Sequence, residues 1–123
     1  MKNSRKNWIA CAATACILLS PLKLLADDIV EFHIPAGTGS SPWNTSDKPV
    51  VVHVGQTLRI FNDDSVTHFL HTEGKPCPHG TAPFGPGVTY DCVISVPYDE
   101  SEQGLYDHNY GPDAQFYVQA NAQ

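Results

Sequence analysis

The sequence lacks sulfur ligands near its C-terminus. No cysteine follows Cys92, and the only methionine is Met1. The chain also lacks the Cys-x-x-Cys-His sequence that attaches haem, the paired histidines of helical metalloproteases and a phosphate-binding loop. Neither Ser65 nor Ser95 has neighbours that would activate a serine nucleophile. We therefore expect a binding protein rather than an enzyme.

Only one apolar segment has the length of a signal peptide. The run from Trp8 to Leu19 follows a basic start, a pattern typical of secretory signals. It is shorter than the roughly 20 residues of a membrane-spanning helix. We expect cleavage after Ala26, which makes residues 1–26 a signal peptide and residues 27–123 one periplasmic or secreted domain.

Basic residues are scarce. Four of the seven Lys and Arg residues lie in the expected signal peptide, whereas all 13 Asp and Glu residues remain in the mature domain, giving it a net charge of −10. This charge opposes binding to nucleic acid or to anionic membranes. It suits a soluble exported protein, with either a cationic envelope protein as partner or simply a well-solvated surface.

No apolar face recurs at helical spacing, and ten prolines and nine glycines divide the chain into short segments. This pattern predicts an all-β fold, an antiparallel Greek-key β-sandwich. Gly55-Gln56 indicates a hairpin between two neighbouring strands. The expected strands are Ile29–Ile34, Val50–Val54, Thr57–Asn62, Thr67–His71, Thr89–Val96, Gly104–His108 and Gln115–Ala120.

Two cysteines remain in the mature domain, Cys77 and Cys92. In an oxidising compartment they most simply form one disulfide, which would fasten the loop from Lys75 to Val88 to the following strand. A loop of this length contributes roughly 3 kcal/mol of stability in the chain-entropy model. The alternative is that one of the two is a thiolate metal ligand and the other is unpaired.

Several segments together resemble the cupredoxins, a class of small copper proteins. Residues 52–62 read Val-His-Val-Gly-Gln-Thr-Leu-Arg-Ile-Phe-Asn, a loose and shortened form of the family pattern Val-x-Val-x-Gly-x-Thr-x-x-x-Phe-x-Asn. An Asn-Asp-Asp turn then leads to His68. Three further segments resemble later strands of that family: Pro86 to Tyr90, Gly104 to Tyr106 and Phe116 to Val118. The resemblance implies a cupredoxin-like β-sandwich.

The resemblance also implies a copper site, but a modified one. His68 stands at the family's first histidine ligand. The family's second ligand cluster contains cysteine, histidine and often methionine, whereas here the segment reads Tyr-Asp-His-Asn-Tyr-Gly-Pro-Asp from residue 106. His108 can supply the imidazole of that cluster, and Asp107 lies close to the position of the missing cysteine.

A third imidazole could come from His71 or His79. Adjacent strand residues face opposite sides, so His71 needs a bulge to join His68, and Asp107 joins only if the strand has ended there.

Without thiolate, copper favours a tetragonal Cu(II) geometry, which suits copper handling or delivery better than rapid electron transfer. Zinc is a competing metal. Two alternatives remain open: a metal-free interaction module, and an electron-transfer protein whose copper site includes Cys77.

Overall fold

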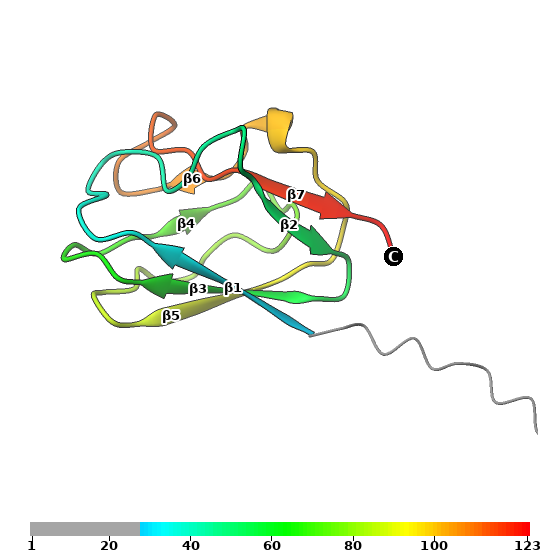
Figure 1. Cartoon of the computed structure of the whole chain (residues 1–123), viewed down its shortest axis with the longest axis horizontal. Coiled ribbons are helices and arrows are strands. Elements are labelled where there is room, and N and C mark those ends of the chain that lie inside the picture. Colours follow the sequence, from blue (N-terminus) through cyan, green and yellow to red (C-terminus); the bar gives the residue numbers. More distant parts are fainter. Residues whose placement is uncertain (1–27) are drawn as a thin grey trace, which may run out of the picture.

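The computed structural model describes residues 28–123, and the expected signal peptide lies outside the described residues. Seven strands and one 3-10 turn follow one another within these described residues (Figure 1). No helix within residues 28–123 is long and apolar enough to cross a membrane. The elements are β1 Ile29–Ile34, β2 Val50–His53, β3 Thr57–Asn62, β4 Leu70–His71, β5 Thr89–Val93, η1 Glu100–Glu102, β6 Tyr106–Asp107 and β7 Val118–Asn121.

The strands form three hydrogen-bonded groups, β1-β3-β5, β2-β7 and β4-β6. Figure 1 shows the β1-β3-β5 sheet on one side of the molecule and the β2-β7 pair on the other. The predicted β-sandwich is confirmed, but its sheets are mixed: β1 pairs with β3, and β2 with β7, in parallel. Every expected strand overlaps an observed one, although several are shorter than expected and β7 ends one residue later, at Asn121.

The predicted hairpin at Gly55-Gln56 is wrong. Strands β2 and β3 flank this turn but belong to different sheets. Both edges of β3 are occupied, one by β1 and the other by β5, so β2 has no free edge to pair with. The turn is instead hydrogen bonded to the chain after β5, where Gly55 donates to Ile94 and Ile94 donates to Gln56, each at 2.8 Å. It carries the chain from one sheet to the other.

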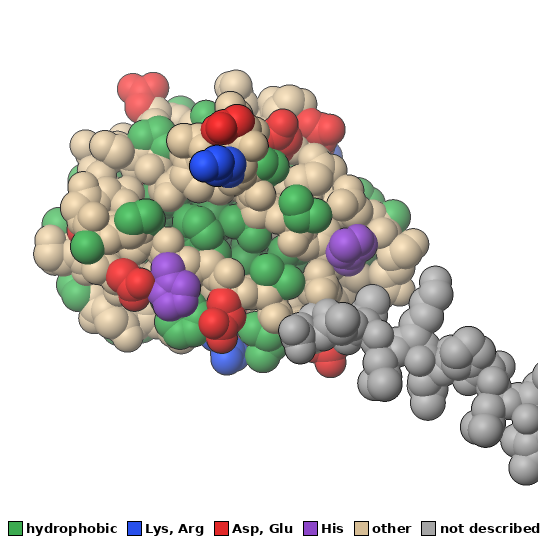
Figure 2. All heavy atoms as spheres, in the orientation of Figure 1, with side chains coloured by type: hydrophobic (Ala, Val, Ile, Leu, Met, Phe, Trp, Pro, Cys, Tyr) green, Lys and Arg blue, Asp and Glu red, His purple; other side chains and the backbone are tan. Residues whose placement is uncertain are grey.

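Alternating side chains build the core between the sheets. In β3, Leu58, Ile60 and Asn62 are buried and the residues between them are only partly so. Val118 and Ala120 alternate in the same way in β7. Burying one face of each strand is what a two-layer sandwich requires. On the face drawn in Figure 2, acidic side chains are scattered and basic ones are few, consistent with the acidic composition.

The disulfide predicted between Cys77 and Cys92 is confirmed. Both cysteines are buried, and the bond fixes the loop after β4 to strand β5. The alternative of a copper site with a Cys77 thiolate is therefore excluded, because that site requires a free thiol.

Candidate metal centre

Strands β4 and β6 sort their side chains onto two faces. Leu70 pairs with Asp107, and both are buried, whereas His71 pairs with Tyr106, and both are partly exposed. His68 lies two residues before Leu70 and is fully buried, because alternate strand residues share a face. The alternation thus sends His68 and Asp107 into the interior and His71 to the surface.

Three histidines meet at the outer face: His71, His79 and His108. The Nδ1 atom of His71 lies 2.9 Å from Nε2 of His79 and 3.2 Å from Nδ1 of His108. All three ligand atoms lie within 4.8 Å of one another. His71 and His79 are partly buried and His108 is exposed, so the cluster opens to solvent.

These separations fit a shared metal ion. Imidazole nitrogens bind zinc at about 2.0–2.1 Å, which puts two ligand nitrogens about 2.9 Å apart at a right angle and about 3.4 Å apart at a tetrahedral angle. The measured 2.9 Å and 3.2 Å fall within that range. The Nδ1 atom of His71 is therefore close enough to each of the other two nitrogens to share a metal ion with it.

The tautomer of a neutral His79 ring is fixed by its neighbour. Its Nδ1 atom lies 2.7 Å from the carbonyl oxygen of Gly80, which can only accept, so Nδ1 carries the proton. A neutral ring then has its lone pair on Nε2, the atom that faces His71. Metal-binding histidines commonly donate their second ring nitrogen to a backbone carbonyl in this way.

The loop that carries His79 is held at several points. Gly80 donates its backbone N–H to Leu70 at 3.1 Å, which binds the loop to β4. Thr72 donates its hydroxyl to the carbonyl of Cys77 at 2.9 Å, and Cys77 is joined to Cys92. His79 is therefore carried by a loop that hydrogen bonds and a disulfide attach to β4 and β5.

Aromatic rings surround the cluster. Tyr106 stacks on His71 with ring centres 4.0 Å apart, and Phe69 lies 5.7 Å from His79 and 5.0 Å from His108. Burial and, secondarily, the neighbouring His79 and His108 lower the pKa of His71. His71 is therefore neutral at neutral pH, the state that a metal ligand needs.

The other two predicted ligands, His68 and Asp107, lie in a separate buried network. His68 Nδ1 contacts Asp107 Oδ2 at 2.5 Å, and His68 Nε2 contacts Asp64 Oδ2 at 3.0 Å. Burial opposes the charged ring, but the hydrogen bonds to the two carboxylates outweigh it and raise the pKa of His68. Neither ring nitrogen of His68 is directed towards the histidine cluster.

Sequence analysis missed two members of that network, Asp64 and Trp43. Asp64 was interpreted only as part of a turn, yet its carboxylate accepts backbone hydrogen bonds from Gly37 and Gly39 at 2.9 and 2.8 Å. Trp43 donates its indole N–H to Asp107 at 3.3 Å. These partners are 25 to 64 residues apart in sequence, so no local pattern reveals them.

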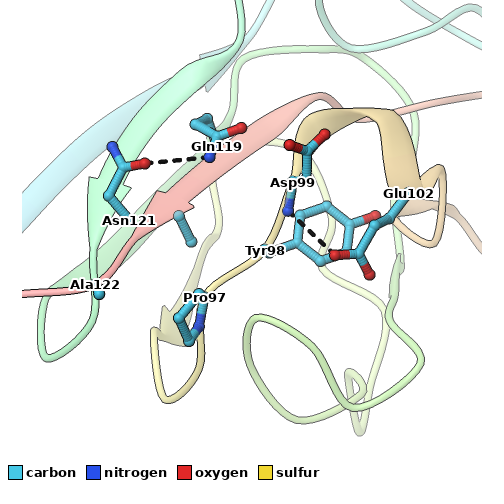
Figure 3. A pocket seen from close by; sticks show the side chains of 8 residues that line it. Pro97, Tyr98, Asp99, Glu102, Gln119, Asn121 and Ala122 are labelled. Carbon is cyan, nitrogen blue, oxygen red and sulfur yellow. Dashed lines mark hydrogen bonds between the residues drawn. The ribbon is translucent and has the colours of Figure 1, made fainter.

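A pocket of about 320 Å³ lies beside η1 and β7, and Asp99 and Glu102 are the acidic residues in its wall (Figure 3). Its acidic side chains are already used. Asp99 accepts the backbone N–H of Ser101 at 2.9 Å, and Glu102 accepts the backbone N–H of Asp99 at 3.2 Å. The two carboxylates cap the 3-10 turn, and no histidine lines this pocket, so it is a weaker candidate than the histidine cluster.

Comparison with known proteins supports the fold alone. No protein-family model and no curated protein matches the sequence. Among solved structures, a purple cupredoxin from Nitrosopumilus maritimus matches with a TM-score of 0.52 and 19% identity, covering 75% of this chain and 99% of that one. A single-site mutant of amicyanin in its Cu(I) form matches with a TM-score of 0.51 and 18% identity, covering 78% of this chain and 85% of that one.

The chain has a cupredoxin fold. Within this cupredoxin fold, the segment expected to carry the first ligand and the loop expected to carry the second ligand cluster do come together, as β4 and β6. The side chains that meet at the surface there are His71 and His108, joined by His79 from the disulfide-bound loop.

Proposed function

We propose that this protein binds one copper ion through His71, His79 and His108 and serves in copper handling or delivery in the periplasm or outside the cell. The observation that carries the proposal is the convergence of three imidazole nitrogens with separations of 2.9 and 3.2 Å. Of the five ligand candidates expected from the sequence, the proposal keeps His71, His79 and His108 and leaves out His68 and Asp107.

The donor set favours copper and a binding role. Imidazole suits copper and zinc, and a given nitrogen site binds Cu(II) more tightly than Zn(II) in the usual order of divalent metals. Rapid blue-copper electron transfer relies on a thiolate ligand, and both cysteines of the described chain are joined in a disulfide. Three imidazoles without a thiolate therefore favour a binding protein over an electron carrier or an enzyme.

The open side of the cluster favours exchange of the metal. His108 is exposed, and no fourth histidine, cysteine or carboxylate among residues 28–123 belongs to the cluster. A ligand from solvent or from a partner protein could therefore complete the coordination. Such a position is what a protein that passes its metal to another molecule needs, because the incoming ligand can bind before the outgoing ones leave.

The direct test is a Cu(II) titration of residues 27–123, followed by electron paramagnetic resonance and repeated in the presence of competing Zn(II). We expect one equivalent of tightly bound Cu(II), weak visible absorption and a wide copper hyperfine splitting. Binding should weaken in acid, because the imidazoles must be neutral to bind metal. Absence of stoichiometric uptake would refute copper binding and favour a metal-free interaction module.

A further inference from the structure

Asp107 is a buried acid that touches four donors. Its exposed fraction is zero. Its Oδ1 atom accepts the backbone N–H of Phe69 at 3.2 Å and that of Asn109 at 3.0 Å. Its Oδ2 atom accepts from Trp43 and contacts His68. A buried charge is costly unless it is paired and hydrogen bonded, and this carboxylate meets both conditions.

Two of those donors lie beside the proposed copper ligands. Phe69 is two residues before His71, and Asn109 directly follows His108. The backbone N–H of His108 also donates to the carbonyl of Phe69 at 2.7 Å. A single carboxylate therefore connects the strand that carries one ligand with the loop that carries another, next to the 3.2 Å contact between their Nδ1 atoms.

Asp107 also shapes the loop through its backbone. Its carbonyl accepts the backbone N–H of Tyr110 at 3.1 Å and that of Gly111 at 2.8 Å. Together with the side-chain bond to Asn109, these contacts close the chain into a tight turn directly after β6. His108 is the first residue of that turn, so its direction depends on how the turn is held.

His68 and Asp64 support the carboxylate from inside. The ring of His68 lies between the two carboxylates and contacts one with each nitrogen. Asp64 is in turn fixed by backbone N–H groups, including that of Gly39 at 2.8 Å. The chain from Asp64 through His68 to Asp107 therefore links the turn after β3 to the loop that carries His108.

We propose that Asp107, held by His68, is a positioning residue that sets the separation of His71 and His108 and so determines the affinity and geometry of the metal site. This inference rests on the proposed copper site. It gives His68 and Asp107, which the sequence suggested as metal ligands, a role in positioning the ligands instead. Outer-shell groups that orient metal ligands typically affect affinity by about 10- to 100-fold.

The test uses three variants of the mature domain. Asp107→Asn removes the charge but retains the shape. Trp43→Phe removes one hydrogen bond to Oδ2 and also shortens a buried side chain, so its melting temperature is compared with that of a core truncation elsewhere. Val118→Ala is the matched control, because Val118 is fully buried in β7 and its apolar side chain forms no hydrogen bond in the network, while its truncation destabilises the core by leaving a cavity. Copper affinity, the hyperfine spectrum and the melting temperature are measured for each.

We expect Asp107→Asn to lower Cu(II) affinity by about 10- to 100-fold and to change the hyperfine splitting. Trp43→Phe should change the Cu(II) affinity and the hyperfine splitting in the same direction as Asp107→Asn, but by a smaller amount. Val118→Ala should lower the melting temperature and leave affinity and spectrum unchanged. Wild-type affinity and spectrum in Asp107→Asn, with only a lower melting temperature, would overturn the positioning role. If Asp107→Asn does not fold, the same comparison is decided by Trp43→Phe.

A metal-free measurement separates this inference from the proposed function. Amide hydrogen exchange at His108 reports its bond to Phe69, and exchange at Asn109 reports its bond to Asp107. Both amides should lose protection in Asp107→Asn beyond the loss seen in Val118→Ala. If wild-type protein binds no copper, the proposed function fails while this result still tests the positioning claim; unchanged protection would refute it.

Discussion

The Nε2 atom of His79 lies 2.9 Å from the Nδ1 atom of His71, although one residue belongs to a disulfide-bound loop and the other to strand β4. His79 Nδ1 carries the ring proton, so a neutral His79 presents a lone pair at this contact. Two unprotonated nitrogens repel each other at such a distance unless a proton or a metal ion lies between them. The contact is therefore either a hydrogen bond donated by the Nδ1–H of His71 or, when His71 carries its proton on Nε2, a pair of lone pairs that one metal ion can bind.

The three clustered histidines should be needed for copper binding, and other histidines should not. Replacing His71, His79 or His108 with alanine removes one of three ligands, so we expect each variant to lose more than the roughly 10- to 100-fold that outer-shell changes cost. His53→Ala is the control, because His53 is exposed on β2 and lies outside the cluster. Competition titrations with a chromophoric chelator measure the affinities. Equal affinities in the His79 and His53 variants would contradict the assignment.

Acid should destabilise the fold through Asp64. Hydrogen bonds from backbone N–H groups, Gly39 foremost, lower the pKa of Asp64 to about 2 from 3.8. Since the folded pKa lies below the unfolded one, the stabilisation is present above pH 3.8 and is lost as pH falls towards 2. A shift of this size corresponds to about 2 kcal/mol. Urea unfolding of Asp64→Asn between about pH 5 and pH 2 should show a flatter pH dependence than wild type, and parallel curves would exclude this role.

His68 should carry protons on both ring nitrogens at about pH 6 in the metal-free protein. Its ring lies between two buried carboxylates, and hydrogen bonds to them outweigh burial and raise its pKa. The stabilisation from a raised pKa is complete below 6.5 and is lost as pH rises through the folded value. Nitrogen-15 NMR of the imidazole distinguishes the charged ring from a neutral one. A neutral His68 at about pH 6 would refute the ion-pair description of the network.

Removal of the disulfide should weaken both the fold and the metal site. The Cys77–Cys92 bond closes a loop with a sequence separation of 15, for which the chain-entropy model gives about 3 kcal/mol. His79 follows Cys77 by two residues, so freeing this loop also frees one ligand. The double variant Cys77→Ala/Cys92→Ala should unfold at lower denaturant concentration and bind Cu(II) less tightly than wild type. Unchanged copper affinity would show that the hydrogen bonds at Thr72 and Gly80 hold the loop without the disulfide.

Local patterns in the sequence were sufficient to predict where the strands lie but not which strands pair with one another. The alternation in residues 57–62 predicts β3 correctly, because one face of that strand is buried. The pairing of β2 with β7 joins segments far apart in the chain, and the sequence holds no local signal for it. This is why the hairpin at Gly55-Gln56 was predicted where a crossing between sheets occurs.

The sequence suggested His71, His79 and His108 as ligand candidates, and these three meet at the surface. It did not show that His68 lies apart from them in the interior. Strand periodicity indicates that His68 and His71 face oppositely, and they do. The resemblance to cupredoxins favoured His68 as the ligand, whereas the structure commits both of its nitrogens to Asp64 and Asp107. Recognising this requires knowing that two distant carboxylates converge on one ring, which is a property of the folded chain.

The most direct test of the copper site is a crystal structure of the copper-loaded mature domain with anomalous diffraction recorded at the copper absorption edge. We predict one strong anomalous peak about 2.0 Å from His71 Nδ1, His79 Nε2 and His108 Nδ1, with His68 still between Asp64 and Asp107. A peak bound to His68 instead, or no peak near the three histidines, would contradict the site.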